Sequence, residues 1–163
     1  MMSFFQISST IKNWEEAAKT VADWKQAGEK IVFTNGCFDL LHFGHLHYLA
    51  EARELGSKLV IGLNSSDSVS RLKGPHRPIN DENTRAHMLA SLKMVDLVVI
   101  FTEDTPLDLI HILTPDVLVK GGDWSPEQII GSDWVLQHGG EVRSLAFMDG
   151  YSTTNIEQKI KSS

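Results

Sequence analysis

The stretch "TNGCFDLLHFGHLHYL", from Thr34 to Leu49, decides how this chain folds. It follows the apolar run at 31–33 and leads into apolar residues at helical spacing, so it joins a predicted strand to a predicted helix. Between the two lie a glycine, an aspartate and two histidines spaced His-x-Gly-His. Glycine permits a sharp turn and a close approach of the backbone to a ligand. The stretch is therefore the first place to look for a binding site.

The rest of the chain alternates between short apolar runs and helical patterns. The runs are rich in β-branched residues and nearly unbroken, which is typical of strands covered on both faces. Strands are expected at 30–34, 58–64, 96–101, 116–120 and 141–147, with helices between them near 45–55, 82–93, from 105, near 126–138 and from 152 to the end. This order predicts an α/β fold with a doubly wound parallel sheet of about five strands and helices on both faces. In such sheets ligands bind beyond the carboxyl ends of the strands.

The length, charge and composition of the chain argue against several classes of protein. The 163 residues most simply form one domain, with residues 1–28 as an N-terminal helical extension and 29–163 as the core. The net charge of −6 argues against a nucleic-acid partner, which favours a basic face. No apolar run is long enough to span a bilayer, and no secretion signal is evident. The single Cys37 cannot form an internal disulfide, which fits a cytoplasmic protein.

The two histidines, His42 and His45, can project from one side of a first helical turn. The backbone N–H groups of Cys37 and Phe38, which follow Gly36, and the positive end of the next helix add further donors. Together they suit a phosphate that gains negative charge during a reaction. Histidines near a helix start are more often surface or capping residues, and a zinc site would need a third ligand at a telling spacing. The combination of strand, glycine turn, aspartate and histidines favours the phosphate site.

The segment "GCFDLLHFGH" resembles the signature of the HxGH nucleotidyltransferase superfamily, whose members have a Rossmann-like fold. "RLKGPHRPIN" (71–80), "VDLVVIFTEDTP" (95–106), "VLVKGGDW" (117–124) and "DGYSTTNI" (149–156) are similar to one branch of it. That branch is the D-glycero-β-D-manno-heptose 1-phosphate adenylyltransferases, including the C-terminal half of the bifunctional heptose kinase/adenylyltransferase. The resemblance covers roughly the last five-sixths of the chain. It implies transfer of AMP from ATP to a sugar 1-phosphate, with release of pyrophosphate and with Mg²⁺ on the phosphates.

The resemblance also implies roles for particular residues. His42 and His45 would donate to the α-phosphate and the bridging oxygen, and Lys73 would neutralise the triphosphate. Arg77 and Arg85 would lie near the acceptor or the triphosphate. The nucleotide-binding candidates are Gly36, Cys37, Phe38, Asp39, Lys120, Gly121, Asp123, Ser152, Thr153 and Thr154, and Asp39 would also assist the metal.

Several of these candidates have a plainer interpretation. Lys73 and Arg77 flank two helix breakers, so they are expected on a mobile loop over the site, although solvated charges also suit this pattern. Arg85 lies early in a predicted helix, where an exposed charge is the alternative. Residues 152–154 suit helix capping, which is compatible with binding of phosphate at the same helix start.

Two other functions stay open at this stage. In the glycerol-3-phosphate cytidylyltransferases the motif "RTEGISTT" carries an arginine that aligns with Phe147, where the heptose branch has phenylalanine, so ATP is favoured over CTP. A non-catalytic nucleotide-binding regulator would have no need for both histidines, Lys73 and the Ser-Thr-Thr segment together. Because the chain shows no kinase half, a separate sugar kinase is expected in the pathway, and a homodimer is expected because family members are commonly oligomeric.

Overall fold

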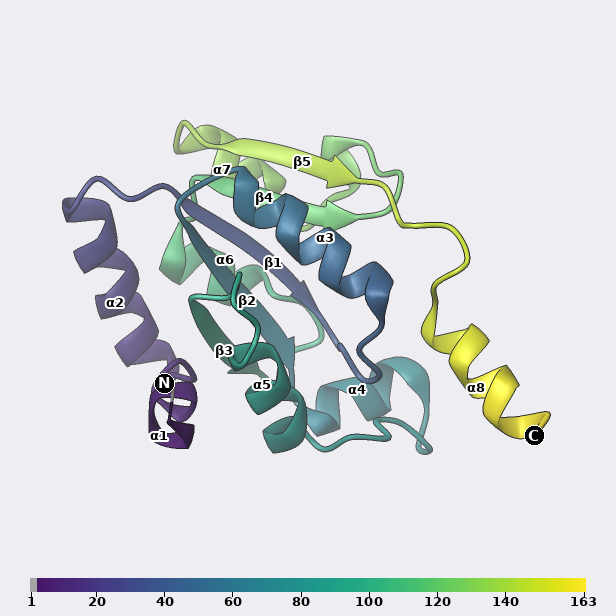
Figure 1. Ribbon diagram of the computed structural model, residues 1–163. Coiled ribbons are helices and arrows are strands. Elements are labelled where there is room, and N and C mark those ends of the chain that lie inside the picture. The colour runs from purple at the N-terminus through teal and green to yellow at the C-terminus, as the bar shows by residue number, and fades with distance from the viewer. Residues whose placement is uncertain (1–2) are drawn as a thin grey trace.

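The computed structural model describes residues 3–163 and contains a five-stranded parallel sheet with the strand order β3-β2-β1-β4-β5. Helices cover both faces of the sheet (Figure 1), which confirms the predicted α/β fold. Successive strands are added first on one side of β1 and then on the other, so the winding reverses between β1 and β4. A ligand is expected at this reversal. The strands are β1 (Ile31–Gly36), β2 (Lys58–Asn64), β3 (Leu97–Phe101), β4 (Val117–Gly121) and β5 (Glu141–Leu145).

The helices connect these strands, and two helices precede the first strand. Within residues 3–163, no helix has both the length and the apolar character that a membrane crossing requires. The helices are α1 (Phe4–Ser8), α2 (Trp14–Gln26), α3 (Phe43–Glu54), α4 (Ser66–Lys73), α5 (Glu82–Ala90), α6 (Leu107–Leu113), the 3₁₀ helix η1 (Pro126–Gln128), α7 (Ser132–Gln137) and α8 (Thr153–Lys161).

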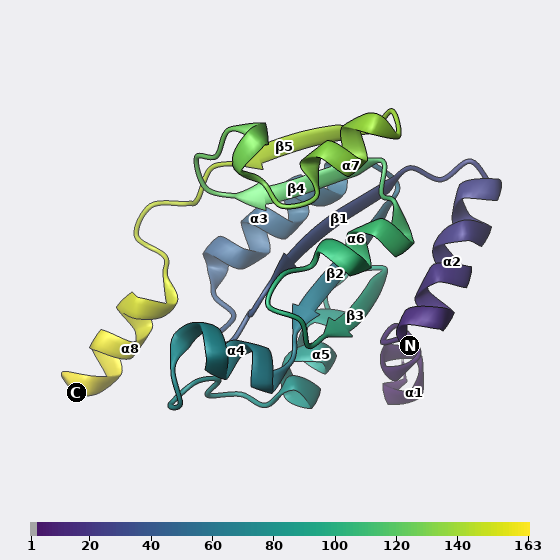
Figure 2. The ribbon, with the colours of Figure 1, turned by 180° about the vertical axis from the view of Figure 1, so that it is seen from behind.

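Alternate residues of the strands point into two separate apolar layers. In β1, Val32 packs with α3 and α5 on one face, while Ile31 and Phe33 pack with α2, α6 and α7 on the other. Figures 1 and 2 show these two helical layers from opposite sides. A strand buried on both faces needs an apolar residue at nearly every position, which is why the strands stand out in the sequence.

The N-terminal segment packs against the sheet. Ala17 and Val21 of α2 are buried in the apolar layer that contains α6. Ile11 forms a parallel bridge with Val98 and so covers the outer edge of β3. The indole N–H of Trp14 donates to the carbonyl of Ile100 at 2.9 Å. Residues 3–28 thus help to complete the core, whereas Met1 and Met2 lie outside the described residues.

The structure differs from the sequence predictions at several helices. Residues 66–73 form α4, a helix that was not predicted, and residues 126–138 are divided into η1 and α7. Gly131, the residue before α7, lies between these two with φ +86°, a left-handed conformation that a continuous helix does not contain. The helix expected from residue 105 begins instead at Leu107, after Pro106 and without a side-chain cap.

Candidate active site

A cavity of about 920 Å³ opens at the carboxyl ends of the strands, where the winding of the sheet reverses. Its size is that of a site for a small molecule or a nucleotide. The walls come from the turn after β1, the end of α4, the end of β4 and the segment that leads into α8. The cavity is lined by twelve of the predicted site residues: Gly36, Cys37, Phe38, Asp39, His42, His45, Lys73, Arg77, Lys120, Gly121, Ser152 and Thr153.

The two histidines lie at the start of α3 with their rings stacked, 3.9 Å between centroids. His42 is the residue before the helix, and His45 is in its first turn. The Nδ1 atoms of both rings are buried and have no hydrogen-bond partner within residues 3–163. A Cβ atom on Gly44 would lie 3.0 Å from the His42 ring, so only glycine fits between the histidines without displacing that ring. Buried polar atoms normally have partners, so two neighbouring imidazole nitrogens without one are unusual and mark this turn as a candidate functional site.

Both imidazoles are neutral at pH 7. Burial lowers the pKa of His45 to about 4, and the Lys73 ammonium, together with His42 whenever it is protonated, acts in the same direction. Burial also lowers the pKa of His42. A neutral imidazole offers one N–H donor and one acceptor nitrogen. The histidines can therefore donate hydrogen bonds to phosphate oxygens, but the positive charge that a triphosphate requires must come from other residues.

The tight turn after β1 is centred on Phe38 and not on Gly36 as predicted. Phe38 has φ +45°, whereas Gly36 is the last residue of the strand. A Cβ atom on Gly36 would lie 2.9 Å from the Phe38 ring, so the glycine makes room for that ring. Burial raises the pKa of the neighbouring Cys37 thiol, which therefore stays protonated at neutral pH. A protonated thiol is a poor nucleophile.

Two lysines supply positive charge to the cavity. Lys73 is the last residue of α4 and Lys120 lies near the end of β4, and both line the cavity. The ion pairs among residues 3–163 use other cationic side chains, so both ammonium groups are available to an anion. Lys73 was expected on a mobile loop, but it belongs to a helix that ends at Gly74, where φ is +101°.

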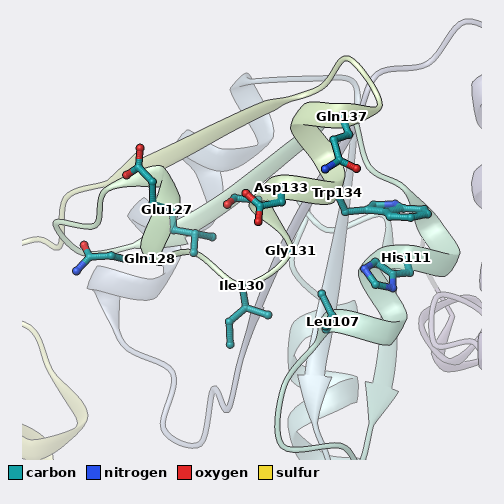
Figure 3. Close-up of a pocket in the computed structure, with 11 residues that line it drawn as sticks. Leu107, His111, Glu127, Gln128, Ile130, Gly131, Asp133, Trp134 and Gln137 are labelled. Carbon is teal, nitrogen blue, oxygen red and sulfur yellow. The ribbon is translucent and has the colours of Figure 1, made fainter.

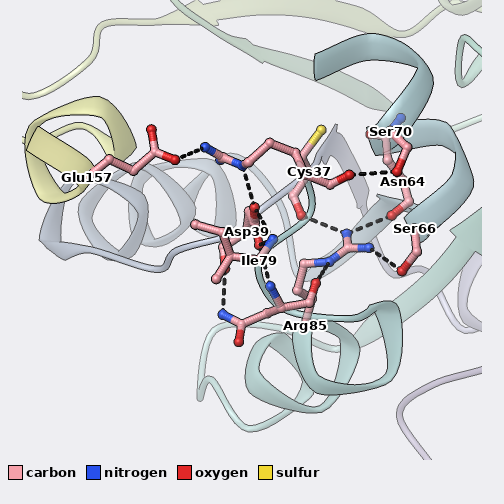
Figure 4. A network of polar contacts seen from close by, with 10 residues as sticks. Cys37, Asp39, Asn64, Ser66, Ser70, Ile79, Arg85 and Glu157 are labelled. Carbon is pink, nitrogen blue, oxygen red and sulfur yellow. Dashed lines mark hydrogen bonds and ion pairs between the residues drawn. The ribbon is translucent and has the colours of Figure 1, made fainter. Parts of the chain in front are cut away.

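Asp39 fixes the segment after α4 (Figure 4). Its carboxylate accepts hydrogen bonds from Nε of Arg77 at 2.7 Å and from the backbone N–H groups of Ile79 and Asn80 at 2.8 Å. Burial would raise the pKa of this carboxyl, but the N–H groups of Asn80 and Ile79 and the Arg77 guanidinium outweigh it and hold the pKa below its usual range. With these oxygens engaged, Asp39 does not fit the predicted role in metal binding. Within residues 3–163 there is also no cluster of three His, Cys, Asp or Glu side chains that could hold a metal.

Arg85 does not line the cavity, in contrast to the prediction. Its side chain is fully buried. Nε donates to the carbonyl of Asn80 at 2.9 Å, and Nη1 donates to the carbonyls of Cys37 and Asn64 at 2.8 and 2.7 Å. The guanidinium thus ties the turn after β1 to the end of β2 and to the start of α5 (Figure 4). Arg85 therefore stabilises the backbone around the site, and its guanidinium, which donates to three carbonyls, is not available to bind a phosphate.

The sequence pattern of the family described as Cytidylyltransferase-like matches residues 33–159. The chain belongs to the cytidylyltransferase-like family. The match begins within β1 and ends within α8, so it includes every wall of the cavity. This confirms the resemblance to nucleotidyltransferases that the His-x-Gly-His stretch indicated.

Curated relatives of this cytidylyltransferase-like domain are longer proteins. The bifunctional protein HldE of Magnetococcus marinus is 53% identical over 156 residues, which are 96% of this chain and 32% of that protein. The bifunctional protein HldE of Geobacter metallireducens is 57% identical over 150 residues, 92% of this chain and 31% of that protein. The chain thus spans about a third of the length of the curated relatives that it matches.

Solved structures show the same architecture. The lipopolysaccharide core biosynthesis protein from Thermoplasma volcanium is 30% identical, with a TM-score of 0.60 over 77% of this chain and 100% of that one. The pantoate-β-alanine ligase from Francisella tularensis has a TM-score of 0.58 over 93% of this chain and 76% of that one. Its identity is 14%, so this second likeness concerns the fold alone.

Two further predicted site residues, Asp123 and Thr154, also lie outside the cavity wall and are exposed. Conversely, the cavity is lined by residues that the sequence did not single out for it. A polar residue at the carboxyl end of a strand was the available signal for Asn35 and Asn64, but Tyr48 and Asn155 carry no such signal. The additional lining residues with polar side chains are Asn35, Tyr48, Asn64, Asp104, Thr105, Asp149, Tyr151 and Asn155.

A second cavity of about 430 Å³ lies between α6 and α7 (Figure 3). Ile130 borders both cavities and so separates them. Glu127 and Asp133 are at the rim of the second cavity, and its lining within residues 3–163 includes no lysine or arginine. Two carboxylates without a cation repel a polyphosphate. The first cavity, with Lys73 and Lys120, is the one that suits a nucleoside triphosphate.

Proposed function

We propose that this chain is an adenylyltransferase that transfers AMP from ATP to a sugar 1-phosphate, with D-glycero-D-manno-heptose 1-phosphate as the acceptor. The observation that carries the proposal is the single cavity that gathers His42, His45, Lys73, Lys120 and the start of α8. These groups come from separate segments of the chain, and each suits a part of a triphosphate. The acceptor is inferred from the resemblance of the sequence to the heptose branch.

In the proposed reaction a phosphate oxygen of the sugar 1-phosphate attacks the α-phosphorus of ATP. A new P–O bond forms, the bond to the α,β-bridging oxygen breaks, and pyrophosphate leaves on the opposite side. Such a displacement depends on alignment and charge neutralisation more than on a protein nucleophile. The protonated thiol of Cys37 agrees with a direct transfer that forms no covalent enzyme intermediate.

The neutral imidazoles of His42 and His45 donate to the α-phosphate and to the bridging oxygen as negative charge builds there. Lys73 and Lys120 neutralise the phosphates. The first turn of α8, with Ser152 and Thr153 at the cavity, holds the pyrophosphate portion through its free N–H groups. The triphosphate would carry Mg²⁺, which would neutralise charge on the phosphates and would need few protein ligands because it keeps several waters. Gly36, Phe38 and Gly121 shape the cavity wall.

We further propose that the enzyme works as a homodimer in the cytoplasm, where ATP is available, and that a sugar kinase supplies the sugar 1-phosphate. The rival within the family is a cytidylyltransferase that acts on glycerol 3-phosphate. At the position where that branch has an arginine, this chain has Phe147, which lines the cavity and cannot pair with a phosphate. A nucleotide-binding regulator is the other rival.

A panel of nucleoside triphosphates and acceptors separates these functions. Each of ATP, CTP, GTP and UTP is combined with heptose 1-phosphate, glucose 1-phosphate or glycerol 3-phosphate, and release of pyrophosphate is measured. We expect ATP with the heptose phosphate to give the highest kcat/KM. A higher value for CTP with glycerol 3-phosphate would overturn the assignment, and tight ATP binding without pyrophosphate from any acceptor would favour the regulator.

A further inference from the structure

Helix α8 stands apart from the rest of the molecule. Figures 1 and 2 both show it projecting beyond the carboxyl edge of the sheet. None of its residues, Thr153–Lys161, is buried among the residues that the structure describes. The chain reaches it through an exposed segment in which Gly150 has φ +85°. A helix without buried residues gains little from apolar packing, so specific contacts must set its position.

One of these contacts is an ion pair that spans 80 residues of sequence. Nη1 of Arg77 donates to Oε1 of Glu157 at 2.6 Å, and Nε of the same guanidinium donates to Oδ2 of Asp39 at 2.7 Å. The side chains of Asp39, Arg77 and Glu157 are 2%, 14% and 28% exposed. Figure 4 shows Glu157 on α8 with its carboxylate directed toward this network. The contact is therefore mostly shielded from water and stronger than an ordinary surface pair.

The positive charge of Arg77 is already neutralised by two carboxylates and is not available to a phosphate. One guanidinium faces two carboxylates, so the three groups together carry a charge of −1 at neutral pH. The planar guanidinium also sets the two carboxylates at a fixed separation, as a flexible ammonium would not. Arg77 therefore suits a role in fixing two parts of the site relative to each other.

We propose that Glu157 is a positioning residue. Through Arg77 and Asp39 it holds the start of α8 at a fixed position relative to the turn that carries His42 and His45. We refer to Asp39, Arg77 and Glu157 as the strut. Glu157 is four residues after Thr153, so both lie on the same face of α8. Asp39 belongs to the turn that carries His42. The strut thus joins the groups that would hold the outer phosphates to those that would act on the α-phosphate, and this role rests on the proposed function.

The test compares Glu157→Ala with Glu54→Ala, which removes an exposed glutamate from the last turn of α3. Hydrogen exchange of the amides in α8 is measured on the free proteins, and KM is measured for ATP and for the acceptor. We expect Glu157→Ala to exchange faster throughout α8 and to raise KM for ATP about tenfold, the scale of one charge-assisted hydrogen bond. KM for the acceptor stays within twofold. Glu157→Gln keeps an acceptor oxygen and falls between wild type and Glu157→Ala.

Arg77→Lys is the second variant. A single ammonium cannot donate to Asp39 and Glu157 in the same planar geometry, so we expect it to reproduce the faster exchange of α8. Unchanged exchange in Glu157→Ala, or an equal rise of both KM values, would overturn the strut. The exchange measurement needs no substrate, so it tests whether the strut holds α8 even if the protein transfers no nucleotide. A lack of nucleotide transfer would refute the proposed function alone.

Discussion

His45→Ala lowers turnover by roughly a hundred- to a thousandfold, the usual effect of removing one donor to a developing negative charge. His45 is half-buried and stacked against His42, and its buried Nδ1 atom has no hydrogen-bond partner within residues 3–163. The loss should appear mainly in kcat, because the donor acts on charge that develops in the transition state. Steady-state rates of pyrophosphate release with ATP and the preferred acceptor measure it.

His47→Ala is the matched control. His47 lies on the same helix but is exposed, 3.4 Å from Glu51, and does not line the cavity. It should retain nearly the wild-type kcat, and both variants should melt close to the wild type. Wild-type rates in His45→Ala would remove this residue from the mechanism.

Arg85→Met lowers the free energy of unfolding by about 3–5 kcal/mol, because three backbone carbonyls lose their buried donor and each such loss costs about 1–3 kcal/mol. Part of that cost is offset because the guanidinium no longer has to be buried. For a domain of this size the melting temperature should fall by on the order of 10 °C. Thermal and urea unfolding, followed by circular dichroism, measure the change.

Arg71→Met is the control for this prediction. Arg71 is an exposed arginine that pairs with the exposed Asp104 at 2.9 Å, and its loss should change stability by less than about 1 kcal/mol. If Arg85→Met kept the wild-type melting temperature and instead raised KM for ATP, Arg85 would bind substrate as the sequence indicated. The burial of its side chain argues for the loss of stability.

The sheet was predictable because its strands are buried on both faces. Residues 58–64 were predicted as a strand, and β2 has these bounds. The predicted strand at 141–147 was two residues too long, since β5 lies at the edge of the sheet, is only partly buried and ends at Leu145. At an edge the apolar pattern no longer marks where pairing stops.

The missed helix, α4, has a weak apolar pattern. In α4 the buried residues are Ser68 and Val69, so the periodicity that predicts a helix is almost absent. The signals that were present are the cap at Ser65, whose side chain accepts from the N–H of Ser68, and the glycine that ends the helix. Reading these two signals together would have placed Lys73 on a helix.

The sequence predicted the residues that line the cavity better than the contacts that hold those residues in place. His42, His45 and Lys73 were predicted together and line one cavity, because the carboxyl ends of parallel strands meet at one edge. The contacts of Arg77 with Asp39 and Glu157 join residues 38 and 80 positions apart, and no periodicity reveals such pairs. For the same reason Arg85 was expected at the substrate, since a buried arginine and an exposed one look alike in sequence.

The most direct test of the central claim is a crystal structure with a non-hydrolysable ATP analogue and Mg²⁺. We predict one nucleotide in the cavity at the end of β1 and β4, with its α-phosphate within hydrogen-bond distance of His42 or His45. The outer phosphates should contact Lys73 and the first turn of α8. A triphosphate bound in the second cavity beside Trp134, or one that reaches only one of these three groups, would contradict the account.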